Sequence, residues 1–166
     1  MATPVKVKKW GSSMAVLILS QYDNGRPTYY RLSDHSHGVD EPVCFGKANV
    51  LIDRGANVTV MTAGPILKNV MAACSDLPVN LVYFSTLKPI DKDVIERFRH
   101  TRMLVVHDAF GLLEAIAEVP DLSLAYLGLP DQFCAWYGTV HDLRKEVHLD
   151  PESIRTAVTK RLEAQS

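Results

Sequence analysis

Short apolar runs alternate with amphipathic segments along most of this chain. One run contains Val58, Val60 and Met61 and ends at a Gly-Pro pair, and a second occupies residues 79–84. Runs this short and this apolar are typical of strands buried on both faces. Between the two runs, apolar residues recur at helical spacing on one face: Ile66, Leu67, Val70, Met71 and Cys74. The pattern predicts a strand–helix–strand unit, which requires a parallel sheet and a right-handed crossover.

The same alternation continues to the C-terminus. We predict a helix with Asp91 as its N-cap, a strand over residues 103–106, a helix over residues 110–119 and a strand over residues 122–127. Two further helices close the chain, with Thr139 and Asp150 as their N-caps. The sequence therefore predicts one three-layer α/β/α domain around a mostly parallel sheet of four to five strands.

The first part of the chain does not fit this alternation. Residues 28–32 are rich in β-branched and aromatic types and predict an isolated strand, whereas residues 33–41 form a polar linker. We therefore divide the chain into residues 1–42, a tail with a linker, and residues 43–166, the α/β domain.

Composition narrows the class of protein. A formal net charge of −1 over 166 residues gives no basic surface for nucleic acid, and residues 14–19, the longest apolar run, are too few to span a bilayer. The three cysteines, Cys44, Cys74 and Cys134, are far apart and have apolar neighbours. We expect reduced core cysteines in a cytoplasmic protein.

Candidate chemistry lies where the predicted strands end, because open parallel sheets bind ligands beyond the carboxyl ends of their strands. His107 and Asp108 are the one titratable pair at such a position, and could act as acid and base or as a structural pair. The structural interpretation is favoured, since neighbouring side chains on a strand point to opposite faces. Gly64 lacks the glycine spacing of a nucleotide site, so we expect a tight strand-to-helix turn there.

Other polar and aromatic positions give weaker indications. His35 and His37 could supply two metal ligands, but no recognised ligand cluster accompanies them, so a solvated linker is favoured. Trp136 and Tyr137 could fill the core or anchor an interface, since both types are frequent binding hot spots. The sequence predicts no catalytic, cofactor-binding or metal-binding residues.

The order of these motifs resembles a known family. Residues 46–64, 79–95, 101–108 and 127–158 are similar, in this order, to the C-terminal domain of transketolase-like, thiamine diphosphate-dependent enzymes. That group includes deoxyxylulose-phosphate synthase and the β subunits of 2-oxoacid dehydrogenases. Residues 26–32 are similar to the closing strand of the pyrimidine-binding domain that precedes it. The resemblance implies that residues 1–42 are the tail of that domain.

The resemblance also implies a role. The chain would be a non-catalytic structural and dimerisation domain, a fragment or small subunit, of an enzyme that transfers ketol groups. Thiamine diphosphate and Mg²⁺ would be bound by upstream domains and not by this chain alone. Its partners would be a second copy, a catalytic subunit, or both. The alternative is a stand-alone binding or regulatory module that keeps the fold without the activity.

Three departures from the family's pattern stand beside this interpretation. Many relatives have an arginine that grips a substrate phosphate at the position of Asp34. Relatives also commonly have a glutamate after the third strand and a glycine-rich loop behind it, whereas residues 107–111 of this chain contain no glutamate and are shorter. As interface or strand-end positions we select Arg31, Gly64, His107, Asp108, Trp136 and Tyr137.

A second similarity is local. Residues 5–16 are similar to the opening strand of small swapped-hairpin antitoxin regulators that bind DNA as dimers. Nothing after residue 16 continues the match, and a short basic strand is usually solvated surface. We therefore do not expect a nucleic-acid partner.

Overall fold

The domain is built on one five-stranded sheet. The computed structural model describes residues 12–31, 33, 36–39, 41–132, 135 and 137–164. The strands are β1 (Ala48–Ile52), β2 (Val58–Ala63), β3 (Asn80–Phe84), β4 (Arg102–His107) and β5 (Leu124–Gly128), in the order β1-β3-β2-β4-β5. Four strands run parallel, and β1 pairs with β3 in the antiparallel sense at one edge. The predicted mostly parallel sheet is confirmed.

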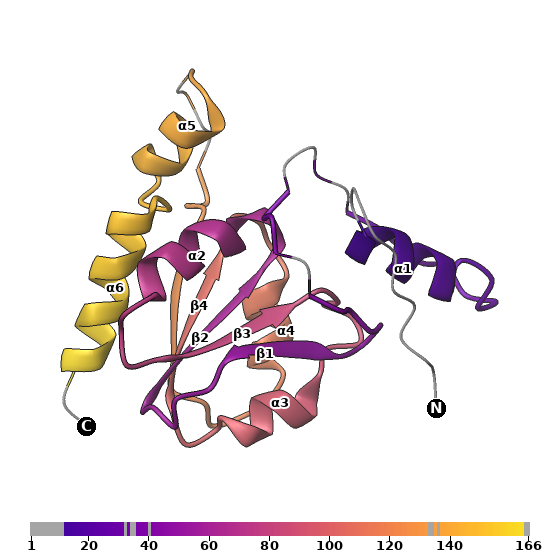
Figure 1. The fold of residues 1–166 in the computed structure, drawn as a ribbon, viewed down its shortest axis with the longest axis horizontal. Coiled ribbons are helices and arrows are strands. Elements are labelled where there is room, and N and C mark those ends of the chain that lie inside the picture. Colours follow the sequence, from indigo (N-terminus) through magenta and orange to yellow (C-terminus); the bar gives the residue numbers. More distant parts are fainter. Residues whose placement is uncertain are drawn as a thin grey trace.

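Helices cover both faces of this sheet (Figure 1). On one face α2 (Leu67–Cys74) and α6 (Pro151–Glu163) pack on Val58 and Val60, and on the other face α3 (Lys92–Arg97) and α4 (Leu112–Ala117) pack on Met61. Because successive strand residues point to opposite faces, one strand serves both cores. The three predicted layers are confirmed, although α4 is shorter than the predicted helix over residues 110–119.

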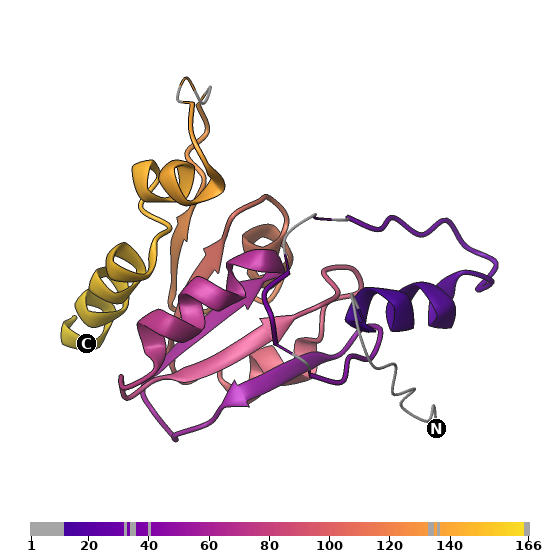
Figure 2. The ribbon, with the colours of Figure 1, turned by 45° about the horizontal axis from the view of Figure 1, so that its top comes forward.

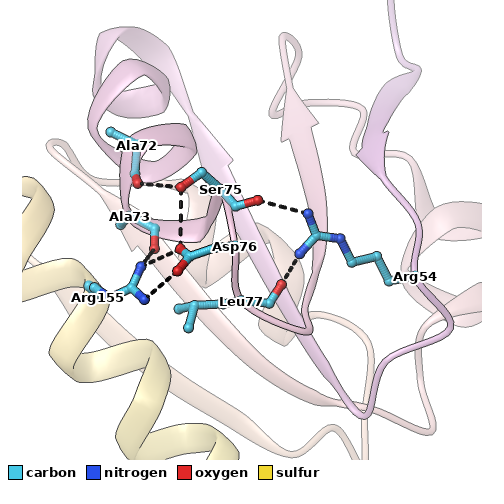
Figure 3. A network of polar contacts seen from close by, with 7 residues as sticks. All are labelled: Arg54, Ala72, Ala73, Ser75, Asp76, Leu77 and Arg155. Carbon is cyan, nitrogen blue, oxygen red and sulfur yellow. Dashed lines mark hydrogen bonds and ion pairs between the residues drawn. The ribbon is translucent and has the colours of Figure 1, made fainter.

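Polar contacts join the end of α2 to α6 and to Arg54 after β1 (Figure 3). Arg155 of α6 makes a two-pronged ion pair with Asp76, with 2.8 Å between its Nη2 and Oδ2 of the carboxylate. Arg54 donates to the carbonyl oxygens of Ser75 and Leu77. The bond to Ser75 satisfies a carbonyl group at the C-cap of α2, and the bond to Leu77 fixes the turn that follows.

The final two helices begin at the predicted caps. Thr139 accepts a hydrogen bond from the Asp142 backbone at the start of α5 (Val140–Glu146), and Asp150 accepts bonds from two backbone N–H groups at the start of α6. Asp91 precedes α3 but makes no side-chain cap. Its carboxylate instead accepts from the Ala48 N–H and from Lys47, which ties α3 to the start of β1.

The N-terminal segment departs from the prediction. Helix α1 (Ser12–Gln21) lies to one side of the sandwich and an extended chain leads back to it (Figures 1 and 2). The predicted strand over residues 28–32 is wrong, because residues 28–31 form no ladder and residue 32 lies outside the described chain. A strand needs a partner edge for its backbone groups, and the described chain offers none beside this segment. In the segment with the local antitoxin similarity, residues 12–16 are helical, while residues 5–11 lie outside the description.

The prediction that all three cysteines lie in the core is only partly right. Cys74 is buried and Cys44 is exposed, both with free thiols, while Cys134 lies outside the described residues. Val43, the neighbour of Cys44, is buried and takes the inward position there. None of the helices in the described ranges combines the length and the apolarity needed to cross a bilayer.

Candidate ligand site at the carboxyl ends of the strands

A cavity of about 1810 Å³ lies at the carboxyl ends of the parallel strands. Gly64, Ser85 and His107, which end or follow β2, β3 and β4, line its base, and Leu129 lines it after β5. The N-terminal segment between Leu17 and Ser33 contributes a second wall, and α5 a third. The cavity thus occupies the place where open parallel sheets bind ligands.

Gly64 makes the tight turn that the sequence predicts. It begins the short 3₁₀ helix η1 (Gly64–Ile66) with a φ of +75°, a left-handed conformation that favours glycine. Burial raises the pKa of the neighbouring Tyr83 hydroxyl, and the Gly64 backbone acts in the opposite direction. The turn therefore has a sufficient structural explanation within the fold.

His107 is buried at the end of β4, with a relative exposure of 5%. Burial lowers the pKa of its imidazole; the charge of Arg31 also lowers it, while Asp108 and Glu114 act in the opposite direction. The Nδ1 atom has no hydrogen-bond partner in the described structure. His107 is therefore a neutral imidazole with an unused polar atom at the cavity.

Asp108 does not pair with its neighbour His107. One of its carboxylate oxygens lies 2.6 Å from Nη2 of Arg144 on α5, and both side chains retain only 18% of their exposure. The pair fixes α5 to the end of β4. The structural interpretation of Asp108 fits this geometry, and a His–Asp acid–base dyad does not.

His37 binds the linker to the sheet. Its ring packs edge-on against Tyr83 on β3 with 5.2 Å between ring centroids, and its Nε2 lies 3.3 Å from the Tyr83 hydroxyl. The other histidine of the metal hypothesis, His35, lies outside the described residues. In the ranges that the structure describes, no three His, Cys, Asp or Glu side chains gather in a way that could hold a metal ion.

Two curated enzymes are similar in sequence to most of this chain. The 1-deoxy-D-xylulose-5-phosphate synthase of Thermus thermophilus is 32% identical over 132 residues, which cover 73% of this chain and 21% of that enzyme. The synthase of Hahella chejuensis is 30% identical over 142 residues, which cover 80% of this chain and 22% of that enzyme. The chain is homologous to the transketolase C-terminal domain family. It spans about a fifth of the length of these curated relatives.

Solved structures show the same fold of the transketolase C-terminal domain. An inactive β4 tetramer of a split-gene transketolase superposes with a TM-score of 0.61 at 24% identity, over 70% of this chain and 42% of that one. The transketolase of Campylobacter jejuni gives a TM-score of 0.55 at 16% identity, over 74% of this chain and 20% of that one. No protein-family model matches the chain.

The structure brings four of the six selected residues of this transketolase-type domain together. Arg31, Gly64, His107 and Asp108 all line the cavity. Tyr137 is fully exposed and is not among the lining residues, so it does not fill the core. Trp136 lies outside the described residues, and its role as an interface anchor stays a prediction.

Sequence reasoning did not select Tyr83 or Arg144, which also line the cavity. Tyr83 was part of an apolar run that predicts only a strand. Arg144 lies 36 residues from Asp108, and no local pattern signals that pairing. Arg144 faces the cavity from α5, a helix with no fully buried residue. Only the fold shows that this charged residue points inward.

Proposed function

We propose that this chain serves as the non-catalytic C-terminal domain of a transketolase-like enzyme that transfers ketol groups, as a fragment or as a small subunit. Its role is to brace the domains that hold thiamine diphosphate and Mg²⁺. The observation that carries the proposal is the extent of homology, which covers 73% of this chain but only 21% of the synthase. The remaining machinery would come from another part of the protein or from a partner.

The described side chains offer no ligand cluster for Mg²⁺. Mg²⁺ prefers carboxylate and other oxygen ligands. Within the described ranges no three acidic, histidine or cysteine side chains converge. The strand ends carry one ion pair, Asp108 with Arg144, which already neutralises the carboxylate. We therefore assign no step of the reaction to this chain.

The proposal also includes a domain boundary, between residues 1–42 and residues 43–166, and the positions of an interface. We propose that Trp136 and Tyr137 anchor a second copy or a catalytic subunit, since Tyr137 is fully exposed and aromatic anchors are enriched at interfaces. Inactivity of the isolated chain is supported by analogy with the split-gene transketolase, whose β4 tetramer is inactive. Reduced thiols at Cys44 and Cys74 support a cytoplasmic location.

The decisive experiment compares the chain alone with the chain plus a catalytic partner. Calorimetry with thiamine diphosphate and Mg²⁺ should detect no tight binding to the purified chain. A pull-down on the tagged chain should recover a subunit that binds the cofactor and shows ketol transfer. Tight cofactor binding by the chain alone would contradict the proposal. The variant Tyr137→Ala should recover less of that subunit, while Lys160→Gln on α6 should recover as much as the unmodified chain.

A second function is a stand-alone binding or regulatory module. The cavity favours it, because several of its buried polar atoms have no partner. Failure to recover a cofactor-binding subunit, together with a ligand found in the cavity, would support this alternative.

A further inference from the structure

Three buried polar atoms at the cavity lack hydrogen-bond partners. They are Nδ1 of His107 at the end of β4, Oγ of Ser85 just after β3, and the hydroxyl of Tyr30 in the N-terminal segment. Buried polar groups in proteins are nearly always paired, so each such atom calls for a partner from outside the chain. Ser85 and His107 come from the strand ends and Tyr30 from the N-terminal segment, and all three residues line the same cavity. A ligand bound there would supply partners from outside the chain.

The charges that line the cavity are mostly positive. Among the described lining residues, Arg26, Arg31, Lys88 and Arg144 are cationic, and Asp108 is the one carboxylate. Asp108 is already paired with Arg144. The charge of Arg31 reaches His107, where it disfavours a further positive charge. A cavity with this balance favours an anion over a neutral or cationic ligand.

Apolar side chains form the rest of the lining. They come from the strand ends and from α5, and include Phe45, Phe84, Leu129, Leu143 and Val147. Pockets for small molecules combine such surfaces with a few polar groups that fix orientation. An inorganic anion alone would leave this apolar surface unused.

We propose that the cavity is a binding site for a small organic anion, in which a phosphate or carboxylate group is joined to a flat apolar group. The anionic group lies on the side of Arg31, with Ser85 and the neutral His107 as hydrogen-bonding partners. The apolar group packs against the side chains of α5 and the end of β5. This function is separate from the bracing role and does not depend on it, because every residue involved belongs to this chain.

Fluorescence titration of the full-length chain tests the proposal with four probes. We expect 1-naphthyl phosphate or 1-naphthoate to bind at least about tenfold more tightly than neutral 1-naphthol and than inorganic phosphate, because only the first two combine both features. Comparing phosphate with carboxylate shows which anion the site prefers. If no probe binds, or if naphthol binds as tightly as both naphthyl anions, the proposal is wrong.

Matched variants locate the bound probe. Arg31→Gln should weaken the binding of the preferred naphthyl anion by about tenfold and leave the affinity for naphthol unchanged. Ser85→Ala should weaken the binding of that anion by a smaller factor. Lys160→Gln, an exposed charge change on α6, should have no effect. Equal effects of Arg31→Gln and Lys160→Gln would overturn the assignment.

Two further measurements keep these results interpretable. An unchanged urea midpoint shows that Arg31→Gln is folded, so its weaker binding is a local effect. In NMR spectra the probe should shift the amide resonances of Gly64, Ser85 and His107. Shifts confined to α6, which contributes no lining residue, would place the probe outside the cavity and would contradict the proposal.

Discussion

At the scale of single residues, the hydrogen-bond partners of His37 determine the protonation state of its ring. The Val39 N–H donates to its Nδ1 at 3.1 Å, so Nδ1 is an acceptor and the proton of the neutral ring is on Nε2. That Nε2–H then faces the Tyr83 hydroxyl at 3.3 Å. A second proton would place two donors against each other at Nδ1. The docked linker therefore requires neutral His37.

This requirement gives linker docking a pH dependence. Burial lowers the pKa of His37 from its usual 6.5, so the contribution of docking is complete above pH 6.5 and is lost as the pH falls through the lower pKa of the docked state. Hydrogen exchange at the Val39 amide, corrected for its intrinsic rate, should become less protected between about pH 7.5 and about pH 5. The variant His37→Gln should lack this change. Equal protection at both pH values in the unmodified chain would refute the mechanism.

Asp76 offers a second residue-scale measurement at the contact between α2 and α6 (Figure 3). The hydrogen bonds from Arg155 lower the pKa of its carboxyl from 3.8 to about 2. Because the pKa is lower in the folded state, this stabilisation is present above pH 3.8 and is lost as the pH falls toward 2. In Arg155→Gln the pKa of Asp76 should rise toward 3.8, as followed by carboxyl NMR titration. Lys160→Gln is the control, and an unchanged pKa in Arg155→Gln would contradict the assignment.

At the scale of elements, the sequence predicts those strands and helices whose burial pattern repeats locally. Val58, Val60 and Met61 predict β2 because a strand buried on both faces is a continuous apolar run. The same reasoning fails at residues 28–31, where the composition is that of a strand but the chain offers no edge for pairing. Strand propensity describes how well a residue fits into a sheet, but a strand also needs the edge of a sheet to pair with.

Helix caps are also local, which is why the sequence locates two of them correctly. Asp150 has a relative exposure of 9% and accepts from the backbone N–H groups of Glu152 and Ser153. Burial opposes its ionisation, but the hydrogen bond from the Ser153 hydroxyl, together with these backbone bonds, outweighs burial and lowers its pKa overall. Asp91 fails as a cap because a distant backbone group, the Ala48 N–H, takes its carboxylate. No local pattern could signal that competition.

The two caps should differ in what they stabilise. Asp150→Ala should lower the free energy of unfolding by about 1 kcal/mol, because α6 carries the buried residues Ile154 and Val158. Asp150→Asn, which keeps an acceptor, should cost less. Thr139→Ala should loosen α5, which has no fully buried residue, without moving the global urea midpoint. Urea unfolding with hydrogen exchange distinguishes the cases, and a global effect of Thr139→Ala would refute the contrast.

At the scale of the whole molecule, the candidate site is assembled by the fold. His107 and Ser85 are far apart in sequence and meet because parallel strands end at the same edge, and Arg31 joins them from the N-terminal segment. The general rule about strand ends identified His107 and Gly64 from sequence. It could not identify Arg144 or Tyr30, because their positions depend on how α5 and the N-terminal segment close over that edge.

The boundary at residues 42 and 43 leads to the last prediction. In the described chain, Leu17 is the one buried apolar residue before Val43, and both core clusters are built from residues after it, with Val39 packed at the margin of one. Residues 43–166 alone should therefore fold cooperatively, with a free energy of unfolding lower by no more than about 2 kcal/mol, the value of one or two apolar side chains. Urea unfolding followed by circular dichroism measures this loss, with the full-length chain as the control.

The same truncation separates the scaffold from the site. It removes Arg31 and Tyr30 together with the wall they form, and keeps Ser85, His107 and Asp108. The truncated domain should therefore lose its preference for a naphthyl anion over naphthol while its sheet stays intact. A domain that fails to fold would show that the N-terminal segment is part of the core and that the boundary is wrong. A folded domain that keeps the full preference would show that the anion is held by the strand ends and α5 alone.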